Sequence, residues 1–153
     1  IGKYTRITNN LYAMNKWMDK YDEVYKKSVG NDFPVLRYPD ILLMYAEALG
    51  EQDRIAEALP YLNRTRTRAG LAGLTSAEVP DKETFIRELA NERGREFALE
   101  GHRWFDLVRL GLAVDYFKNL GYTLDSHNLL FPIPKDQIEI VNDNNILWQN
   151  PGF

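Results

Sequence analysis

The sequence predicts a mainly α-helical protein, in which tetratricopeptide-like helical hairpins are followed by an extended C-terminal coil. Apolar residues recur at helical spacing through residues 39–68 and 81–110, and glycines stand near the ends of these stretches. The two stretches are offset by about forty residues, which is in the range of helical repeats. After Gly121 the helical spacing is lost, and residues 131–134 (Phe-Pro-Ile-Pro) form a proline-fixed, extended segment.

Residues 1–36 are predicted to be an irregular or partly helical lead-in, and residues 37–153 to be one helical domain. Polar and glycine-rich positions at 9–10 and 30–32 indicate loops. A helix is predicted between them, over residues 11–27. Its apolar residues at helical spacing are Leu11, Met14, Met18, Tyr21 and Tyr25.

The first strong helix is predicted over residues 39–49. Pro39 suits a first-turn position and Gly50 a stop. This stretch is apolar on nearly all sides, so we expect the helix to be buried among other elements. Glu47 is the exception, and we expect it to lie at an edge or to pair with an arginine.

Asp53 is expected to cap a second helix that runs to about Arg68, with Pro60 either kinking it or delaying its start. Because the connection is short, the two helices should pack side by side as an antiparallel hairpin. The expected contact residues are Tyr45, Ala46, Leu49, Ala58 and Leu62.

Residues 70–80 read as a loop. Asp81 should cap a third helix that runs through about Glu100. A shorter helix follows over 102–110 and is closed by Gly111. Farther on, residues 135–139 could make one turn, and the last four residues should form a coil laid over the surface.

Charged and apolar residues interleave in the stretch 92–111, which holds four arginines and four acids. Glu92 with Arg95, Arg93 with Glu96, and Glu100 with Arg103 are spaced to meet on one helix face. We therefore predict a partly buried structural charge network. Its members are Glu92, Arg93, Arg95, Glu96, Glu100, Arg103 and Asp106.

An enzyme is the competing interpretation, since Glu92, Glu96 and Glu100 are successive neighbours on one helix. Glycoside hydrolysis needs two acids on opposite sides of a sugar cleft, and helix neighbours on one wall rarely flank a ligand. We therefore predict no catalytic residues. His102 and His127 lack a second histidine at ligand spacing, so neither a metal nor a cofactor is predicted.

The composition of the chain excludes further classes of function and of site. The chain has 153 residues and a net charge of −3, which does not suit an electrostatic nucleic-acid binder. The local basic run at Arg64, Arg66 and Arg68 is interpreted as a solvated or acid-paired helix end. There is no cysteine, which excludes disulfides and thiolate metal sites. No apolar run approaches the length of a membrane span.

Five blocks of the chain resemble motifs of the SusD/RagB family, in the same order and spacing. Residues 37–48 resemble its RYxxxLLxYAEA block, 63–70 its NxxRxRAG helix end, and 92–111 its ERxRELxxEGxRWFDLxRxG block. Residues 131–134 and 149–153 resemble its FPIP and QNPGY ending. Two departures are visible.

These departures are single residues. Gly94 stands where a larger, often charged residue is usual, and Phe153 replaces the common tyrosine. The resemblance covers the C-terminal part of the family and implies an outer-membrane, lipid-anchored, nutrient-binding protein. Such proteins lie over a TonB-dependent SusC-like transporter and hand it glycans or other oligomers. Because the chain starts at Ile1 and not at Met, we expect the lipid anchor in residues that precede it.

No ligand-binding residue follows from a motif match. Trp17 and Trp148 remain candidates for stacking on a sugar, since both stand in less regular segments. The aromatics inside the matched blocks are expected to be buried; they are Tyr38, Tyr45, Trp104 and Phe105. The alternative function is an independent tetratricopeptide-like protein-interaction domain.

Overall fold

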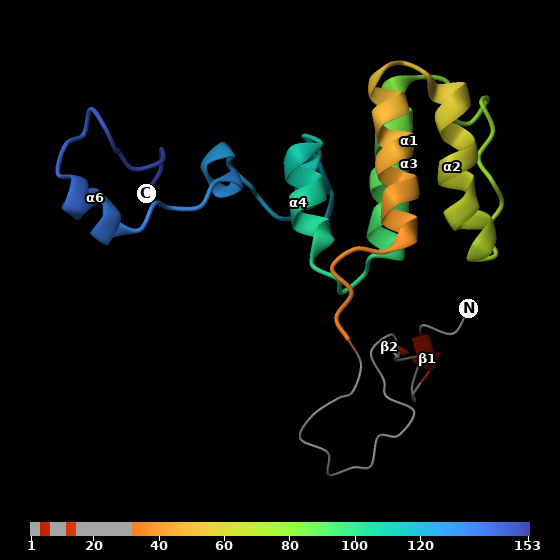
Figure 1. Ribbon diagram of the computed structural model, residues 1–153, viewed down its shortest axis with the longest axis horizontal. Coiled ribbons are helices and arrows are strands. Elements are labelled where there is room, and N and C mark those ends of the chain that lie inside the picture. The colour runs from red at the N-terminus through yellow and green to blue at the C-terminus, as the bar shows by residue number, and fades with distance from the viewer. Residues whose placement is uncertain (1–3, 7–11, 15–31) are drawn as a thin grey trace, which may run out of the picture.

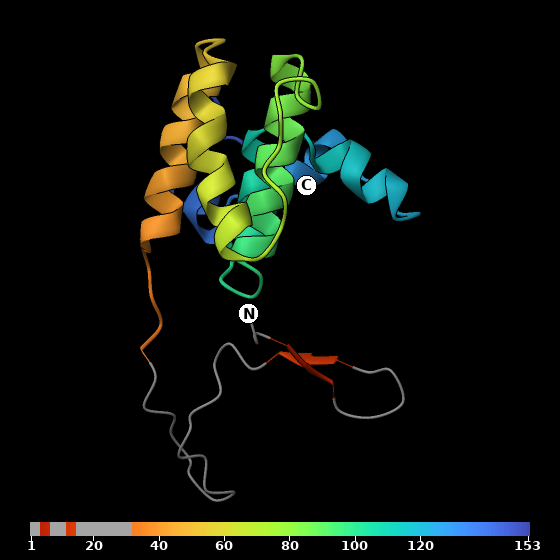
Figure 2. The ribbon, with the colours of Figure 1, turned by 90° about the vertical axis from the view of Figure 1, so that its right-hand side faces the viewer.

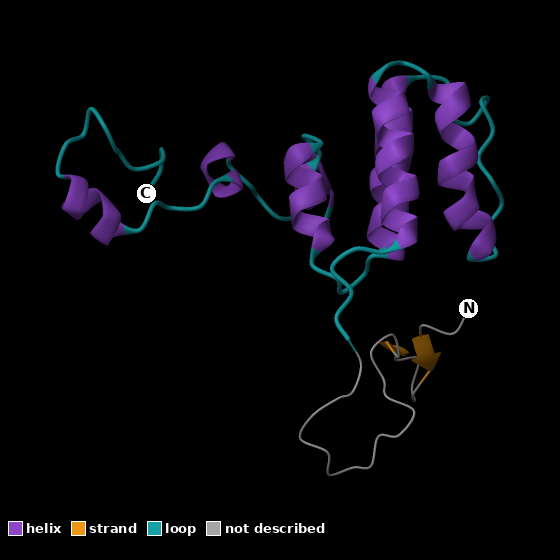
Figure 3. Cartoon of the chain, viewed as in Figure 1, coloured by secondary structure: helices purple, strands orange, loops and turns teal. Residues whose placement is uncertain are grey.

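The computed structural model describes residues 4–6, 12–14 and 32–153 of the chain, which are mainly helical (Figures 1 and 3). Near the N-terminus, β1 (Tyr4–Arg6) pairs antiparallel with β2 (Tyr12–Met14). The helix predicted over 11–27 is therefore wrong at 12–14, and its remainder lies outside the described residues. Alternating large side chains suit a strand as well as a helix over so short a stretch, and here a partner strand decided the outcome.

The predicted antiparallel hairpin is confirmed by α1 (Tyr38–Glu51) and α2 (Ile55–Arg68), which lie side by side in both ribbon views (Figures 1 and 2). Ala46 and Ala58 are fully buried, and small residues of this kind allow two helices to approach closely. The rings of Tyr45 and Tyr61 meet edge to face, with centroids 4.7 Å apart.

Two details of this hairpin differ from the prediction. Gly50 does not stop α1, which continues to Glu51; a Cβ on Gly50 would lie 2.2 Å from Cε1 of Phe85, so the glycine serves a close approach. Asp53 does not cap α2, because it has a left-handed backbone (φ 59°) and Arg54 occupies the cap position. Pro60 lies inside α2 and does not delay its start.

The third helix, α3 (Lys82–Glu96), packs against both α1 and α2 (Figure 2). Its predicted cap is confirmed, since the Asp81 side chain accepts a hydrogen bond of 2.7 Å from the Thr84 amide. The three helices enclose the hydrophobic core. Its largest fully buried side chains include Leu43, Leu62, Val79, Phe85 and Leu89.

α3 ends at Glu96 and not at Glu100 as predicted. A tight turn follows, with positive φ at Leu99 (63°) and Gly101 (82°), and it leads into α4 (His102–Arg109). The chain then forms α5 (Ala113–Asn119), which the sequence did not predict. We call the region from α1 to α5, residues 38–120, the helical body.

Residues 121–153 form a C-terminal arm that extends away from the helical body (blue in Figure 1). It contains a 3₁₀ turn, η1 (Ser126–Leu129), and α6 (Lys135–Val141), which is longer than the predicted single turn. The tail does not lie over the body. Instead it folds back on its own arm, where the Gln149 amide exchanges two 2.8 Å hydrogen bonds with the backbone of Ile133.

The prediction that α1 is buried on nearly all sides is wrong. α2 and α3 cover one face only, and Ile41 and Met44 on the other face are exposed. Three of the four aromatics expected inside the core are also exposed: Tyr38 (61%), Tyr45 (49%) and Phe105 (62%). Periodicity identifies apolar faces but cannot show how many of them find a partner.

Candidate functional site

The centre of the charge network is Arg93, which is buried between three helices. From α3, its guanidinium donates to Asp40 of α1 (Nη1–Oδ1 2.7 Å) and to Asp106 of α4 (Nε–Oδ2 2.8 Å). Both carboxylates are buried as well. One arginine thus joins three helices through two charge-assisted hydrogen bonds, which are stronger than neutral ones.

Arg109 extends this chain of charges toward the surface. It donates to the free oxygen of Asp106 (2.8 Å from Nη2) and forks onto Glu47 of α1, with Nη2–Oε2 at 2.9 Å. The pKa of Arg109 is raised, chiefly by the hydrogen bonds to Glu47 and further by those to Asp106. Glu47 thus pairs with an arginine at the edge of α1, as the sequence predicted.

Arg37, the residue before α1, is the centre of a second cluster of ion pairs, which we call the Arg37 clamp. Its guanidinium binds Glu100 with two bonds of 2.8 Å and Glu96 with one of 2.9 Å. It also donates to the backbone oxygen of Glu96 at 3.1 Å. Arg68, at the end of α2, pairs with the other oxygen of Glu96. This clamp thus joins the segment before α1 to the end of α3 and to the turn that follows it.

Phe97 contacts the central arginines of both ion-pair clusters. Its buried ring lies between the guanidinium groups of Arg37 (5.0 Å to the ring centroid) and Arg93 (5.1 Å). A cation above an aromatic face is attracted by the negative charge of the π system. The His102 ring is a further neighbour, with its centroid 4.8 Å away.

The third part of the network lies between α2 and α3. The buried carboxylate of Glu92 accepts from Arg95 at 2.9 Å and lies 3.6 Å from Arg66. Arg66 also holds the following loop through the Ala72 carbonyl. Two members of the basic run at the end of α2, Arg66 and Arg68, therefore pair with acids of α3.

The structure places six of the seven predicted network residues in ion pairs, but with partners that differ in part from those predicted. Glu92 and Arg95 pair as their spacing indicated. Arg93 pairs with Asp40 and Asp106 where Glu96 was expected, and Glu100 pairs with Arg37 where Arg103 was expected. Arg103 donates to the backbone oxygen of Ala90.

Sequence reasoning missed two partners that other elements supply, Arg37 and Asp40. It interpreted the run that contains Arg66 and Arg68 as a solvated or acid-paired helix end, and both residues are paired with acids. Arg37 and Asp40 were inside a matched motif, which was the only signal that could have marked them.

The charged side chains of this network bind one another, which limits the groups left to contact a ligand. Within the described part of the chain, no buried side-chain nitrogen or oxygen lacks a hydrogen-bond partner. The network carboxylates accept hydrogen bonds from guanidinium groups of the same protein. The described residues also contain no group of three side chains able to hold a metal ion. None of their helices combines the length and apolarity that crossing a membrane requires.

Of the candidate sugar-stacking residues, Trp148 is exposed (60%) on the C-terminal arm, where it lines a small hollow with Ile133 and Ile146. Trp17 lies outside the described residues. Trp104 is half-buried, and its ring packs edge to face on Phe117.

The family model described as the SusD family matches residues 1–153, the whole chain. The chain belongs to the SusD family. A SusD-like protein of Bacteroides fragilis is similar in structure, with a TM-score of 0.74 and 27% identity over 93% of this chain and 30% of that one.

Curated SusD relatives are similar at the level of sequence. SusD-like protein P2 of Formosa agariphila is 34% identical over 84% of this chain and 27% of its own length. The starch-binding protein SusD of Bacteroides thetaiotaomicron is 30% identical over 80% of this chain and 22% of its own. The chain thus spans about a quarter of the length of the SusD proteins that it matches.

Proposed function

We propose that this chain is the C-terminal scaffold of a SusD-like nutrient-binding protein of the outer membrane. In this proposal the whole protein is lipid-anchored, takes up glycans or other oligomers, and passes them to a TonB-dependent SusC-like transporter. Family membership supports the general role, and a relative is named for binding starch. The observation that carries the scaffold role is the buried network of Arg93, Asp40 and Asp106, which fixes three helices to one another.

The proposed activity is binding without catalysis. Glu96 and Glu100 come from one turn and share Arg37, so they cannot stand on opposite sides of a sugar. Incubating the pure protein with polysaccharides and assaying for new reducing ends tests this. We expect none. Reproducible turnover that Glu96→Gln or Glu100→Gln abolishes would show an enzyme.

Glycan binding by the isolated chain should be weak, because the chain spans about a quarter of the length of its relatives and a partial site is not preorganised. Calorimetric titration with starch, xylan and mucin oligosaccharides checks this expectation. Micromolar binding that is lost in Trp148→Ala would place a complete neutral-glycan site within these residues. Mapping of acylation and surface exposure in cells that produce the longer protein tests the proposed localisation.

A second candidate function, a tetratricopeptide-like interaction domain, is supported by the outer face of α1. Ile41, Met44 and Tyr45 are exposed there side by side, and contiguous exposed apolar residues are typical of contact surfaces. A purified SusC-like transporter can be titrated with the chain and with Ile41→Glu. Loss of binding in the variant would favour this role, whereas unchanged binding would exclude this face.

A further inference from the structure

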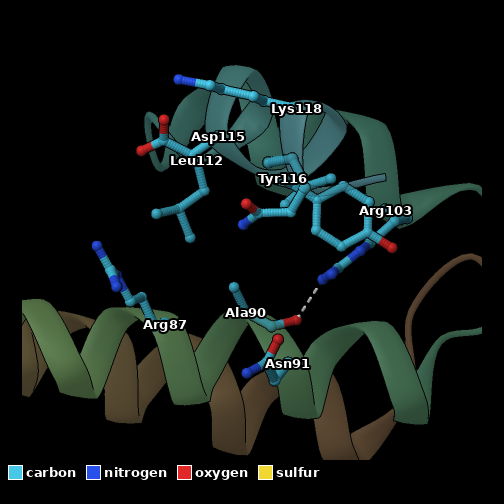
Figure 4. A pocket seen from close by; sticks show the side chains of 10 residues that line it. Arg87, Ala90, Asn91, Arg103, Leu112, Asp115, Tyr116 and Lys118 are labelled. Carbon is cyan, nitrogen blue, oxygen red and sulfur yellow. Dashed lines mark hydrogen bonds between the residues drawn. The ribbon is translucent and has the colours of Figure 1, made fainter. Parts of the chain in front are cut away.

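A pocket of about 330 Å³ lies between α3 and α5, on the side of α3 away from Arg37. Figure 4 shows Arg87 and Arg103 on either side of Leu112 within it. This volume is within the range of sites for small ligands. No member of the ion-pair network described above lines it, and Arg103, which was predicted to belong to that network, does.

Gly94 determines where the Arg103 side chain lies. A Cβ at position 94 would come within 2.7 Å of Nη1 of Arg103, so the guanidinium occupies space that any larger residue would take. Nη1 donates to the Ala90 carbonyl at 2.6 Å, and the Tyr116 ring covers the guanidinium at 4.5 Å. Arg103 is thereby held against α3, and its other N–H donors make no hydrogen bond with the residues that the structure describes.

The pocket is positively charged, although the chain as a whole has a net charge of −3. Three cations line it, Arg87, Arg103 and Lys118, against the single carboxylate of Asp115. Arg87 is partly neutralised by Glu83 at 2.7 Å. Lys118 is exposed and makes no ion pair with any residue that the structure describes. The arrangement favours an anion, and a planar guanidinium suits a carboxylate or a sulfate group.

The other side chains that line the pocket indicate what kind of molecule would bear the anionic group. Asn91 and Asn119 offer amides that can both donate to and accept from hydroxyl groups. Ala90 and Leu112 form an apolar floor between them, which suits the C–H face of a sugar ring. Such a mixture of a few polar groups on an apolar base is typical of small-molecule sites.

We propose that the α3–α5 pocket binds a pyranose that carries an anionic substituent, either a carboxylate or a sulfate ester. The anionic substituent would lie beside Arg103, within the positive potential to which Arg87 and Lys118 also contribute, and the ring hydroxyls beside the two asparagines. The choice of a sugar rests on the proposed function, whereas the preference for an anion rests on the charges alone.

Titration of the ¹⁵N-labelled chain by NMR, at constant ionic strength, tests this inference. Glucuronate, glucose 6-sulfate, glucose and inorganic sulfate are the probes. We expect the two acidic sugars to shift the amide signals of Ala90, Leu112 and Tyr116 in a saturable manner. Glucose and inorganic sulfate should each bind at least about tenfold more weakly, a difference of about 1.4 kcal/mol.

Two variants and one control locate the site. Lys118→Gln removes an exposed charge without touching the core, and Gly94→Ala displaces Arg103 without removing any charge. Gly94→Ala should weaken glucuronate binding by about tenfold, the loss of one charge-assisted contact. Lys118→Gln should weaken it by about twofold, because an exposed charge that acts only through its potential contributes less. Lys135→Gln, the matched control on α6, should bind as the unaltered chain does.

Several outcomes would overturn the inference. Equal affinity for glucose and glucuronate would remove the role of the anion, and equal affinity for inorganic sulfate would remove that of the sugar. Binding unchanged in Lys118→Gln, whose fold is not at risk, would put the site elsewhere. If the longer protein binds neutral glycans while this pocket ignores acidic sugars, this inference fails and the proposed function stands.

Discussion

The helical body and the C-terminal arm are held together in different ways. In the body, charged and apolar contacts join residues far apart in sequence, such as Arg93 with Asp40 and Arg37 with Glu100. In the arm, large apolar residues are exposed, including Ile140 (76%) and Phe131 (70%). Its side-chain hydrogen bonds span short separations, as between Gln149 and Ile133.

This difference shows that stability is not spread evenly along the chain. The body has a shared core, so removing one of its central contacts should affect the whole unit. The arm has no comparable core, so its contacts should open locally. Substitutions in the two regions can therefore test the comparison directly.

The largest effect is expected for Arg93→Ala. This change leaves the buried carboxylates of Asp40 and Asp106 without their shared cation, which should destabilise the body by about 3–5 kcal/mol. Chemical denaturation measures the effect. Arg87→Ala, on the exposed face of the same helix, is the control and should change stability by no more than about 0.5 kcal/mol. An unchanged melting temperature in Arg93→Ala would refute a structural role for the network.

A smaller effect is expected for Gly50→Ala in the core. The added methyl group would overlap the Phe85 ring, with the nearest atom 2.2 Å away. Alanine is intrinsically the better helix former, but the displacement of a buried ring should dominate and cost about 1–3 kcal/mol. Thermal unfolding followed by circular dichroism measures it. A gain in stability would show that Phe85 can move freely, and that the core is less tightly packed than described.

For the arm, Gln149→Ala should act locally. It removes the hydrogen bonds to both backbone groups of Ile133, each with a net value of about 0.5–1.5 kcal/mol. Amide exchange at Ile133 should become faster, whereas exchange in α3 should not change. Faster exchange throughout the body would contradict the separation of the two regions.

The smallest effect concerns pH and the cap of α3. The hydrogen bond from the Thr84 amide lowers the pKa of Asp81 below its ordinary value. Because the folded pKa is the lower one, the stability that this carboxylate adds is present at neutral pH. It is lost below about pH 4, as the pH falls through the folded pKa. Asp81→Asn keeps a capping oxygen but does not titrate, so the difference between the two proteins should shrink on acidification. A constant difference would show that Asp81 is not the titrating cap.

The sequence predicted those features that depend on neighbouring residues. The hairpin, the Asp81 cap and the Glu92–Arg95 pair all follow from spacings within a few turns. The Arg93–Asp40 contact joins residues 53 apart, and no local spacing can indicate it. α3 was predicted too long, because the turn that ends it contains Leu99 in a left-handed conformation, which a leucine in an apolar helical pattern does not indicate.

The pocket shows a second reason why sequence alone could not predict the whole structure. Arg103 was expected to reach Glu100, because the two are one helical turn apart. Whether it could turn instead toward Ala90 depended on the absence of a side chain at Gly94. Helical spacing lists possible neighbours, but packing selects among them. The exposure of Tyr38 and Phe105 has a similar cause, because exposure depends on which faces other elements cover.

The Arg37 clamp also has a consequence for synthesis of the chain on the ribosome. Arg37 emerges 63 residues before Glu100, so this clamp closes completely only after both have been synthesised. Until translation has passed the turn after α3, the α1–α2 hairpin lacks the contacts of Arg37 with Glu96 and Glu100. It also lacks α3, which packs against its apolar face. A ribosome that stalls before this turn would therefore leave a nascent hairpin with exposed apolar surface, the kind of species that chaperones recognise and that aggregates.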